Sequence, residues 1–270
     1  MRTLNRKTCF VVSIMAVCLL AAPAMAQVFT DPVGFVKVDV YRDGLTMISV
    51  PLEAADKRLN DGENPPAPGS IGEMVAENLK GGPSGGESDE IFKWDATLQR
   101  YKAAFLVEFP GTTFDGTWFD PDAAAVSDMT FSAGEAMWID RKSAGEPTET
   151  ITFLGWVPME GTRSVTFLKG LSMFGYPFPV TVAINDTNLN EPPITGGPSS
   201  GEADTVYAWD PVNGRYDAAF LVDFAGSPFH GKWFDPDAND LSAITFDPGS
   251  AAWFDRYPDN PATWLVPRPY

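Results

Sequence analysis

The stretch YKAAFLVEF, residues 101–109, returns 115 residues later as YDAAFLVDF, residues 216–224. The register holds without a gap around it: between Gly81 and Arg141, 34 of 61 positions are identical in the block from Gly196 to Arg256. Identity at this level over one fixed period means that a single structural unit is used twice. The chain is therefore a tandem duplication.

Both copies show the alternation of β-strands. In the first stretch, Ala103, Phe105 and Val107 fall on one face, and Ala218, Phe220 and Val222 repeat the pattern in the second. A period of two predicts half-buried strands. With 24 Gly and 24 Pro in 270 residues, short strands joined by turns are favoured over helices. The sequence predicts an all-β fold of two homologous tandem domains, each sandwich-like or an open barrel.

One short helix is expected, in the first copy only. A segment that the second copy lacks begins with Ser70-Ile71-Gly72-Glu73, which is a capping-box pattern. Apolar Met74, Val75 and Leu79 follow, and Gly81-Gly82 supplies a stop signal.

Residues 1–26 have the pattern of a secretory signal peptide. A basic start is followed by an apolar centre at 10–20 and by Ala24-Met25-Ala26 as a small-residue cleavage signal. We expect the mature protein to begin at Gln27 and to be secreted to the extracellular space, the cell surface or the periplasm. The two copies are then expected as domains at 27–147 and 148–270.

Removal of this leader changes both the cysteine content and the charge. Cys9 and Cys18 both lie in it, so a mature chain without disulfides or thiolate ligands is expected. The remaining 36 acidic residues against 16 basic ones give a formal charge of −20. Such a surface repels nucleic acid and anionic membranes. No later stretch approaches the ~20 apolar residues of a membrane span, so neither a nucleic-acid partner nor a span is expected.

Several motifs recur at the strands of each copy. In the first copy they are GLTMISVPL at 44–52, Trp94-Asp95 with the following Tyr101, and FSAGEAMWI at 131–139. This order resembles a loosely defined tandem β-domain of secreted and cell-surface bacterial proteins. The resemblance implies an exported location and a β architecture, and such domains generally have no known activity.

Catalytic patterns are weak in this chain. Residues 82–86 and 197–201 match G-x-S-x-G, but both lie in Gly/Pro-rich loops that lead into a strand, whereas a nucleophile elbow follows one. A triad needs a histidine, and His230 is the only one in the sequence, with Asp115 at the same place in the first copy. No catalytic residue is predicted. A hydrolase that uses paired carboxylates is kept as an alternative.

The loop WFDPDA at 118–123, repeated at 233–238, offers hard oxygen ligands that suit Ca²⁺. It lacks the D-x-[DN]-x-[DN]-G pattern, and Asp-Pro-Asp is equally an ordinary turn in which Asp bonds to backbone N–H groups. Calcium and a plain turn both stay open at this point. The candidate metal ligands are Asp120, Asp122, Asp235 and Asp237.

The same loop offers aromatic side chains that could stack on the apolar faces of sugars. Trp94 and Trp138 share strand faces with apolar residues and are expected in the core. Trp118 and Trp233 lie beside the acidic loop and are expected to be exposed. The candidate ligand-binding residues are Trp118, Phe119, Trp233 and Phe234.

These observations predict a secreted, non-enzymatic structural or interaction protein of the cell surface or extracellular space. Its expected partner is an extracellular protein or a glycan, and self-association through strand edges is a further option. The alternatives are a carbohydrate-binding protein, with or without calcium, and a secreted hydrolase.

Overall fold

The computed structural model describes residues 32–41, 44–54, 69–75, 79–142 and 148–270. The expected signal peptide, with Cys9 and Cys18, lies outside these ranges, as does the proposed start at Gln27. Within them, no helix has the length and apolar character needed to cross a membrane.

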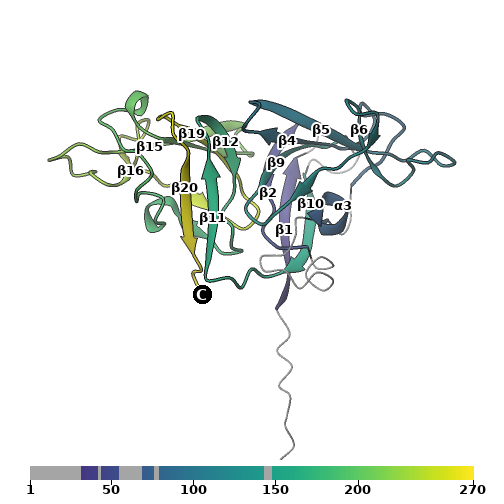
Figure 1. The fold of residues 1–270 in the computed structure, drawn as a ribbon, viewed down its shortest axis with the longest axis horizontal. Helices are drawn as coiled ribbons and strands as arrows, with labels where there is room; N and C mark the ends of the chain where they lie inside the picture. Colours follow the sequence, from purple (N-terminus) through teal and green to yellow (C-terminus); the bar gives the residue numbers. More distant parts are fainter. Residues whose placement is uncertain (1–31, 42–43, 55–68, 76–78, 143–147) are drawn as a thin grey trace, which may run out of the picture. The chain divides into compact units, whose positions relative to one another are not determined.

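The fold is nearly all β, as predicted, and strands of both copies dominate Figure 1. The first copy contains β1 (Val33–Tyr41), β2 (Leu45–Ser49), β3 (Gly69–Ser70), β4 (Glu90–Asp95), β5 (Arg100–Leu106), β6 (Trp118–Asp120), β7 (Ala125–Val126), β8 (Thr130–Phe131), β9 (Ala136–Asp140) and β10 (Thr148–Trp156).

The second copy repeats this series strand for strand, so that β11 corresponds to β1 and β20 to β10. Its strands are β11 (Thr162–Phe167), β12 (Gly170–Phe174), β13 (Val182–Ala183), β14 (Thr205–Asp210), β15 (Arg215–Leu221), β16 (Trp233–Asp235), β17 (Asp240–Leu241), β18 (Thr245–Phe246), β19 (Ala252–Arg256) and β20 (Ala262–Pro267).

Each copy forms one antiparallel six-stranded sheet and two antiparallel two-stranded ribbons. The sheets have the orders β2-β9-β4-β5-β6-β7 and β12-β19-β14-β15-β16-β17. The ribbons are β1-β10 and β3-β8 in the first copy, and β11-β20 and β13-β18 in the second. The identical topology confirms the predicted duplicated all-β fold.

Strand β10 belongs to the first copy by its pairing. It lies antiparallel to β1 along its whole length, from Trp156 opposite Val33 to Thr148 opposite Tyr41. Its Ile151 and Phe153 are buried in the first copy's core. The predicted domain boundary after residue 147 would place β10 in the second domain. The pairing of β10 with β1 shows instead that the first copy extends through Trp156. The contacts of both copies together join Pro32–Tyr270 into one unit.

Each copy has a hydrophobic core of its own. In the first, Ile91 of β4 and Met137 of β9 pack with Phe153 of β10 and with other apolar residues. In the second, Val206 of β14 and Trp264 of β20 occupy the corresponding places. Removal of these side chains from water is the main force that holds each sheet against its ribbon.

The predicted short helix is present as α3 (Ile71–Met74). The backbone N–H of Ser70 donates to Glu73 Oε2 at 2.6 Å, as the capping-box pattern indicates. The helix ends at Met74, before the expected stop at Gly81-Gly82, because Val75 is extended and forms a bridge with Phe153. The second copy has a 3-10 turn, η1 (Ile184–Asp186), at the same place after β13.

Candidate functional site

A second apolar layer lies between the two copies, on the face of each sheet that points away from its own core. Trp94 packs edge-to-face on Trp253, with ring centroids 5.3 Å apart. Trp138 packs in the same way on Trp209 at 5.2 Å. Since Trp209 and Trp253 are the repeat counterparts of Trp94 and Trp138, the two contacts are reciprocal.

Hydrogen bonds follow the same reciprocal pattern. Ser49 N donates to Gly249 O at 2.8 Å, and its counterpart Gly175 N donates to Gly134 O at 2.8 Å. Within each copy, the Nε1 of an interface tryptophan donates a hydrogen bond to a tyrosine hydroxyl. Trp138 donates to Tyr101 and Trp253 donates to Tyr216, both at 3.1 Å. Such self-complementary contacts are the signature of an isologous interface, here formed between two halves of one chain.

The prediction that Trp94 and Trp138 are core residues needs correction in one respect. They are packed among apolar residues, but in the layer between the copies and not in the core of a copy. Strand alternation puts Ile91 and Met137 toward the core and Phe92 and Trp138 toward the other copy.

The expected exposure of Trp118 and Trp233 is wrong. Trp118 is 9% exposed and Trp233 is fully buried, each packed in the core of its own copy. Both rings are therefore inaccessible to a sugar. Phe119 and Phe234 point the opposite way and are half-buried, and Phe119 packs on Phe105 with ring centroids 5.4 Å apart.

The candidate calcium loops are turns. Asp120 Oδ1 accepts hydrogen bonds from the backbone N–H groups of Asp122 and Ala123 at 2.8 and 3.0 Å. Asp235 Oδ1 accepts the equivalent pair at 2.8 and 3.0 Å. Calcium takes six to eight oxygen ligands. Among the described residues, no group of three or more His, Cys, Asp or Glu side chains could hold a metal ion. The geometry thus supports the turn, and Asp122 and Asp237 contribute backbone donors to it.

The Trp-Asp motif has the same explanation. Asp95 Oδ1 accepts from the N–H groups of Thr97 and Leu98, both at 3.0 Å, in the β4–β5 hairpin. Asp210 makes the corresponding bonds in the β14–β15 hairpin. Repetition of these aspartates in both copies therefore follows from turn formation.

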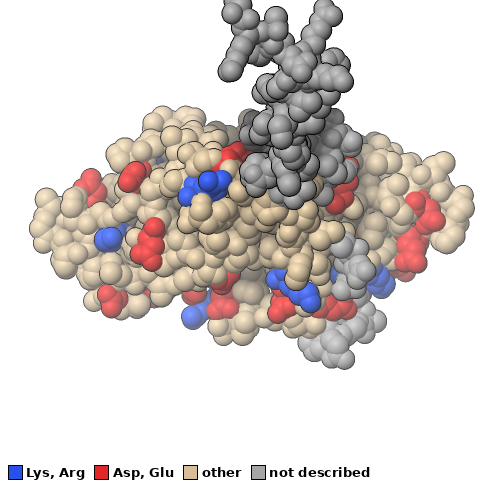
Figure 2. All heavy atoms as spheres, turned by 90° about the horizontal axis from the view of Figure 1, so that it is seen from below, with Lys and Arg blue, Asp and Glu red and all other residues tan. Residues whose placement is uncertain are grey.

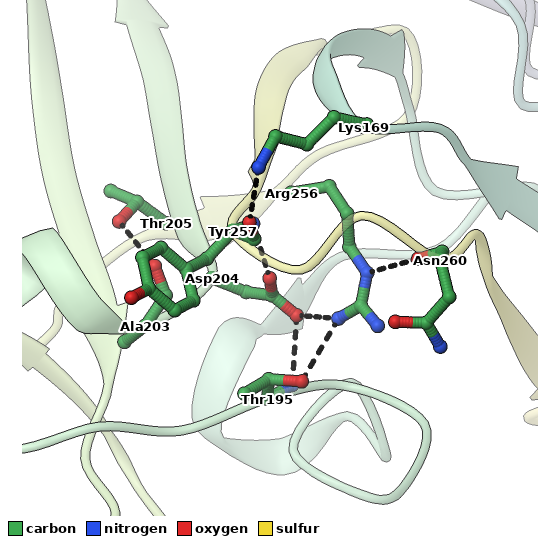
Figure 3. A network of polar contacts seen from close by, with 8 residues as sticks. All are labelled: Lys169, Thr195, Ala203, Asp204, Thr205, Arg256, Tyr257 and Asn260. Carbon is green, nitrogen blue, oxygen red and sulfur yellow. Dashed lines mark hydrogen bonds and ion pairs between the residues drawn. The ribbon is translucent and has the colours of Figure 1, made fainter.

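Sequence reasoning missed a buried ion pair in each copy. Asp204 Oδ2 contacts the Arg256 guanidinium and accepts from Thr195 N at 2.8 Å, while Oδ1 accepts from Tyr257 N at 2.9 Å (Figure 3). Asp204 and Arg256 are at most 1% exposed. Asp89 and Arg141 form the same pair in the first copy, with 3.2 Å between Arg141 Nη1 and Asp89 Oδ2.

This pair fixes a loop and a strand end around each sheet, because its carboxylate bonds to backbone from both. A signal was present in the sequence: Asp and Arg are both retained at the same repeat positions. Retention alone does not say which of many acids pairs with which base, so the partner could be found only from the fold.

The G-x-S-x-G loops are also explained by backbone contacts. Gly82 N donates to Leu106 O at 3.1 Å, and Gly197 N donates to Leu221 O at 3.0 Å, so each loop lies along the end of β5 or β15. His230 lies in an exposed loop, with Nδ1 3.3 Å from Asp223 Oδ1.

A cleft of about 610 Å³ lies where the two copies meet. The first copy contributes residues from 93–96, Lys102 and side chains between 128 and 135, and the second contributes 164–166 and 172–173. Lys93 Nζ lies 3.0 Å from Glu135 Oε2 and donates to Thr130 O at 2.6 Å.

The charged side chains of this cleft all come from the first copy, whereas the second copy contributes the hydroxyl groups of Ser164, Thr166 and Ser172. The repeat counterparts of its charged residues are mostly uncharged or of opposite sign. Ala208 replaces Lys93, Asp217 replaces Lys102, Ala243 replaces Asp128 and Ser250 replaces Glu135.

Charged side chains on the face of the molecule drawn in Figure 2 are dispersed. On this face, acidic and basic residues lie scattered among uncharged ones, and the described part of it has no continuous basic patch.

Comparisons with known proteins add no relative, because no family model, curated protein or solved structure matches the chain.

Proposed function

We propose that the chain is an exported, non-enzymatic interaction protein in which two β-units, held together by their aromatic layer, present the cleft between them as a contact site. The observation that carries this proposal is that the charged side chains of the cleft all come from one copy. The second copy builds the same sheet with Ala208 and Ser250, so the fold does not require Lys93 and Glu135. Residues that the fold does not require are available for binding.

Strand pairing adds a second reason. Lys93 of β4 lies directly opposite Lys102 of β5. Like charges at opposed positions destabilise a sheet, and proteins accept such local conflicts mainly at functional sites. The second copy has Ala208 opposite Asp217 at these positions and so avoids the conflict.

The non-enzymatic part of the proposal is supported by the work that the retained acids do. Asp120 and Asp235 form turns, and Asp89 and Asp204 are buried in ion pairs. Asp95 is retained and lines the cleft, but its Oδ1 accepts hydrogen bonds from the backbone N–H groups of Thr97 and Leu98 in a hairpin turn. The other two carboxylates of the cleft, Asp128 and Glu135, are replaced by Ala243 and Ser250 in the second copy.

Export and lack of catalysis can be tested together. The full chain is produced in a secreting bacterial host and is expected outside the cytoplasm. Its intact mass should equal that of a chain that begins at Gln27. A chain that stays in the cytoplasm with the leader attached would contradict the export.

Lack of catalysis is tested on the exported protein, which is incubated with glycoside and ester substrates. Turnover that the exchange Glu135→Ser abolishes would replace the proposal with the hydrolase alternative.

A further inference from the structure

We infer that the cleft between the copies binds a neutral carbohydrate. This inference rests on the proposed function and names the ligand class for its contact site. The volume of about 610 Å³ lies within the range of ~300–1,000 Å³ typical of small-molecule sites. The ligand class follows from three properties of the lining: its charge balance, its apolar wall and its preorganisation.

Charges of both signs line the cleft. Lys93 and Lys102 face it together with Asp95, Asp128 and Glu135. A ligand with a strong charge of either sign would meet like charges there. A sugar hydroxyl both donates and accepts hydrogen bonds, so it can bond to an ammonium group through one lone pair and to a carboxylate through its proton. A neutral polyhydroxylated ligand therefore matches the mixed lining.

An apolar wall completes the site. Trp94 lines the cleft together with Met173 of the second copy, and both are only partly buried in the aromatic layer, so part of their apolar surface faces the cleft. The indole is held in place because its Nε1 donates to Leu171 O at 2.8 Å. Its counterpart, Trp209, has a buried Nε1 with no hydrogen-bond partner among the described residues. Aromatic and aliphatic surfaces suit the C–H faces of a sugar ring, which neither a phosphate nor a metal ion presents.

The polar groups are preorganised. Lys93 is held by Thr130 O and by Glu135, and Glu135 Oε2 also accepts from Ser132 N at 2.8 Å. Ligand binding then costs less side-chain entropy than it would with mobile lysine and glutamate.

Isothermal titration calorimetry of the exported chain tests the inference. The probes are neutral tetrasaccharides of glucose, xylose, mannose and N-acetylglucosamine, with tetragalacturonate as the acidic comparison. We expect at least one neutral probe to bind with a Kd of about 1 mM or less. The double variant Lys93→Ala/Glu135→Ser carries the second copy's own residues and is expected to weaken this binding at least ~10-fold.

Lys102→Asp is the second variant, because Lys102 is exposed and the change again copies the second copy. The matched control is Asp217→Ala, at the counterpart position outside the cleft, which is expected to leave the Kd unchanged. Thermal melting verifies that each variant is folded.

The outcomes separate the two proposals. No binding of any neutral probe at about 10 mM overturns the ligand class and leaves the non-enzymatic interaction protein standing. Binding that neither cleft variant weakens overturns the location, and tighter binding of tetragalacturonate overturns the preference for a neutral ligand. Cleavage of a bound probe overturns the proposed function while it supports the carbohydrate site.

Discussion

At the scale of single residues, the buried ion pair has the clearest energetic consequence. Asp204 bonds to the Arg256 guanidinium and to the backbone of Thr195 and Tyr257, all in a nearly dry environment. A buried charge that loses its partner keeps its desolvation cost without compensation. Because loop, strand and arginine all depend on one carboxylate, this side chain stabilises the fold out of proportion to its size.

We predict that Asp204→Asn lowers the free energy of unfolding by about 3–5 kcal/mol, because the isosteric amide leaves the guanidinium of Arg256 buried without its counterion. Urea unfolding measures the change. Asp237→Asn is the matched control, since that side chain is exposed, and a change within ~0.5 kcal/mol is expected there. Equal effects of the two exchanges would show that the buried pair is not a structural anchor.

A second residue-scale prediction concerns alkaline pH. Partial desolvation raises the pKa of Tyr101 and of Tyr216 above the ordinary value of 10.0, although the two residues are still 41% and 40% exposed and the hydrogen bond that each hydroxyl accepts from a tryptophan acts in the opposite direction. The unfolded chain therefore releases these protons at a lower pH than the folded chain. Stability that is present below about pH 10 is lost as the pH rises through the raised pKa values.

Thermal melting is expected at a lower temperature at about pH 11 than at about pH 9. In the variant Tyr101→Phe/Tyr216→Phe this decrease should be smaller. If tyrosinate absorbance of the folded protein shows every tyrosine titrating at or below pH 10, the partial desolvation of these hydroxyls is refuted.

The burial of single side chains could be predicted from the sequence only in part. Alternation shows correctly that neighbours along a strand fall on opposite faces, but not which face is covered. In this protein both faces of the sheet are buried near its centre. The acidic neighbours of Trp118 predict an exposed ring, yet β6 turns that ring into the core.

At the scale of elements, the hairpins are set by local chemistry. Asp95 and Asp120 each accept two backbone N–H bonds just after a strand, and their counterparts do the same in the second copy. This local pattern, like the capping box of α3, could be predicted from the sequence because partner and backbone lie within a few residues. The pairing of β1 with β10 could not be assigned as easily, because over a hundred residues separate the two strands.

Asp120→Ala is expected to lower the free energy of unfolding by about 1 kcal/mol, since the β6–β7 turn loses its side-chain acceptor for two backbone donors. Asp122→Ala should have a smaller effect, because Asp122 enters those bonds through its backbone N–H. Urea unfolding of both variants, each with and without millimolar Ca²⁺, also tests the turn against the metal site. If calcium stabilises the wild-type protein and both exchanges abolish this effect, the result would favour a metal site over a plain turn.

At the scale of the whole molecule, the duplication explains why the sheet is buried on both faces. Each copy shields its own core, and each covers the outer aromatic face of the other. The reciprocal pairs Trp94–Trp253 and Trp138–Trp209 link the copies through the same residues on both sides. The cleft lies beside this layer, so its shape depends on a fixed relation between the copies.

The aromatic layer should therefore couple the stability of the two copies. In the variant Trp138→Ala/Trp253→Ala, both rings leave cavities in the layer, since each is buried. Truncation of a buried tryptophan typically costs about 3–5 kcal/mol. We expect calorimetric unfolding of this variant to separate into two transitions, one for each copy. A single transition at the unaltered temperature would show that the layer contributes nothing to the coupling.

The most direct test of the coupled pair of β-units is differential scanning calorimetry of the wild-type chain. The reciprocal aromatic layer predicts one transition, with a calorimetric enthalpy equal to the van't Hoff enthalpy, because neither copy can unfold without exposing the aromatic face of the other. Two resolved transitions, with a calorimetric enthalpy clearly above the van't Hoff value, would mean that the copies fold independently and that the cleft between them is not a fixed site.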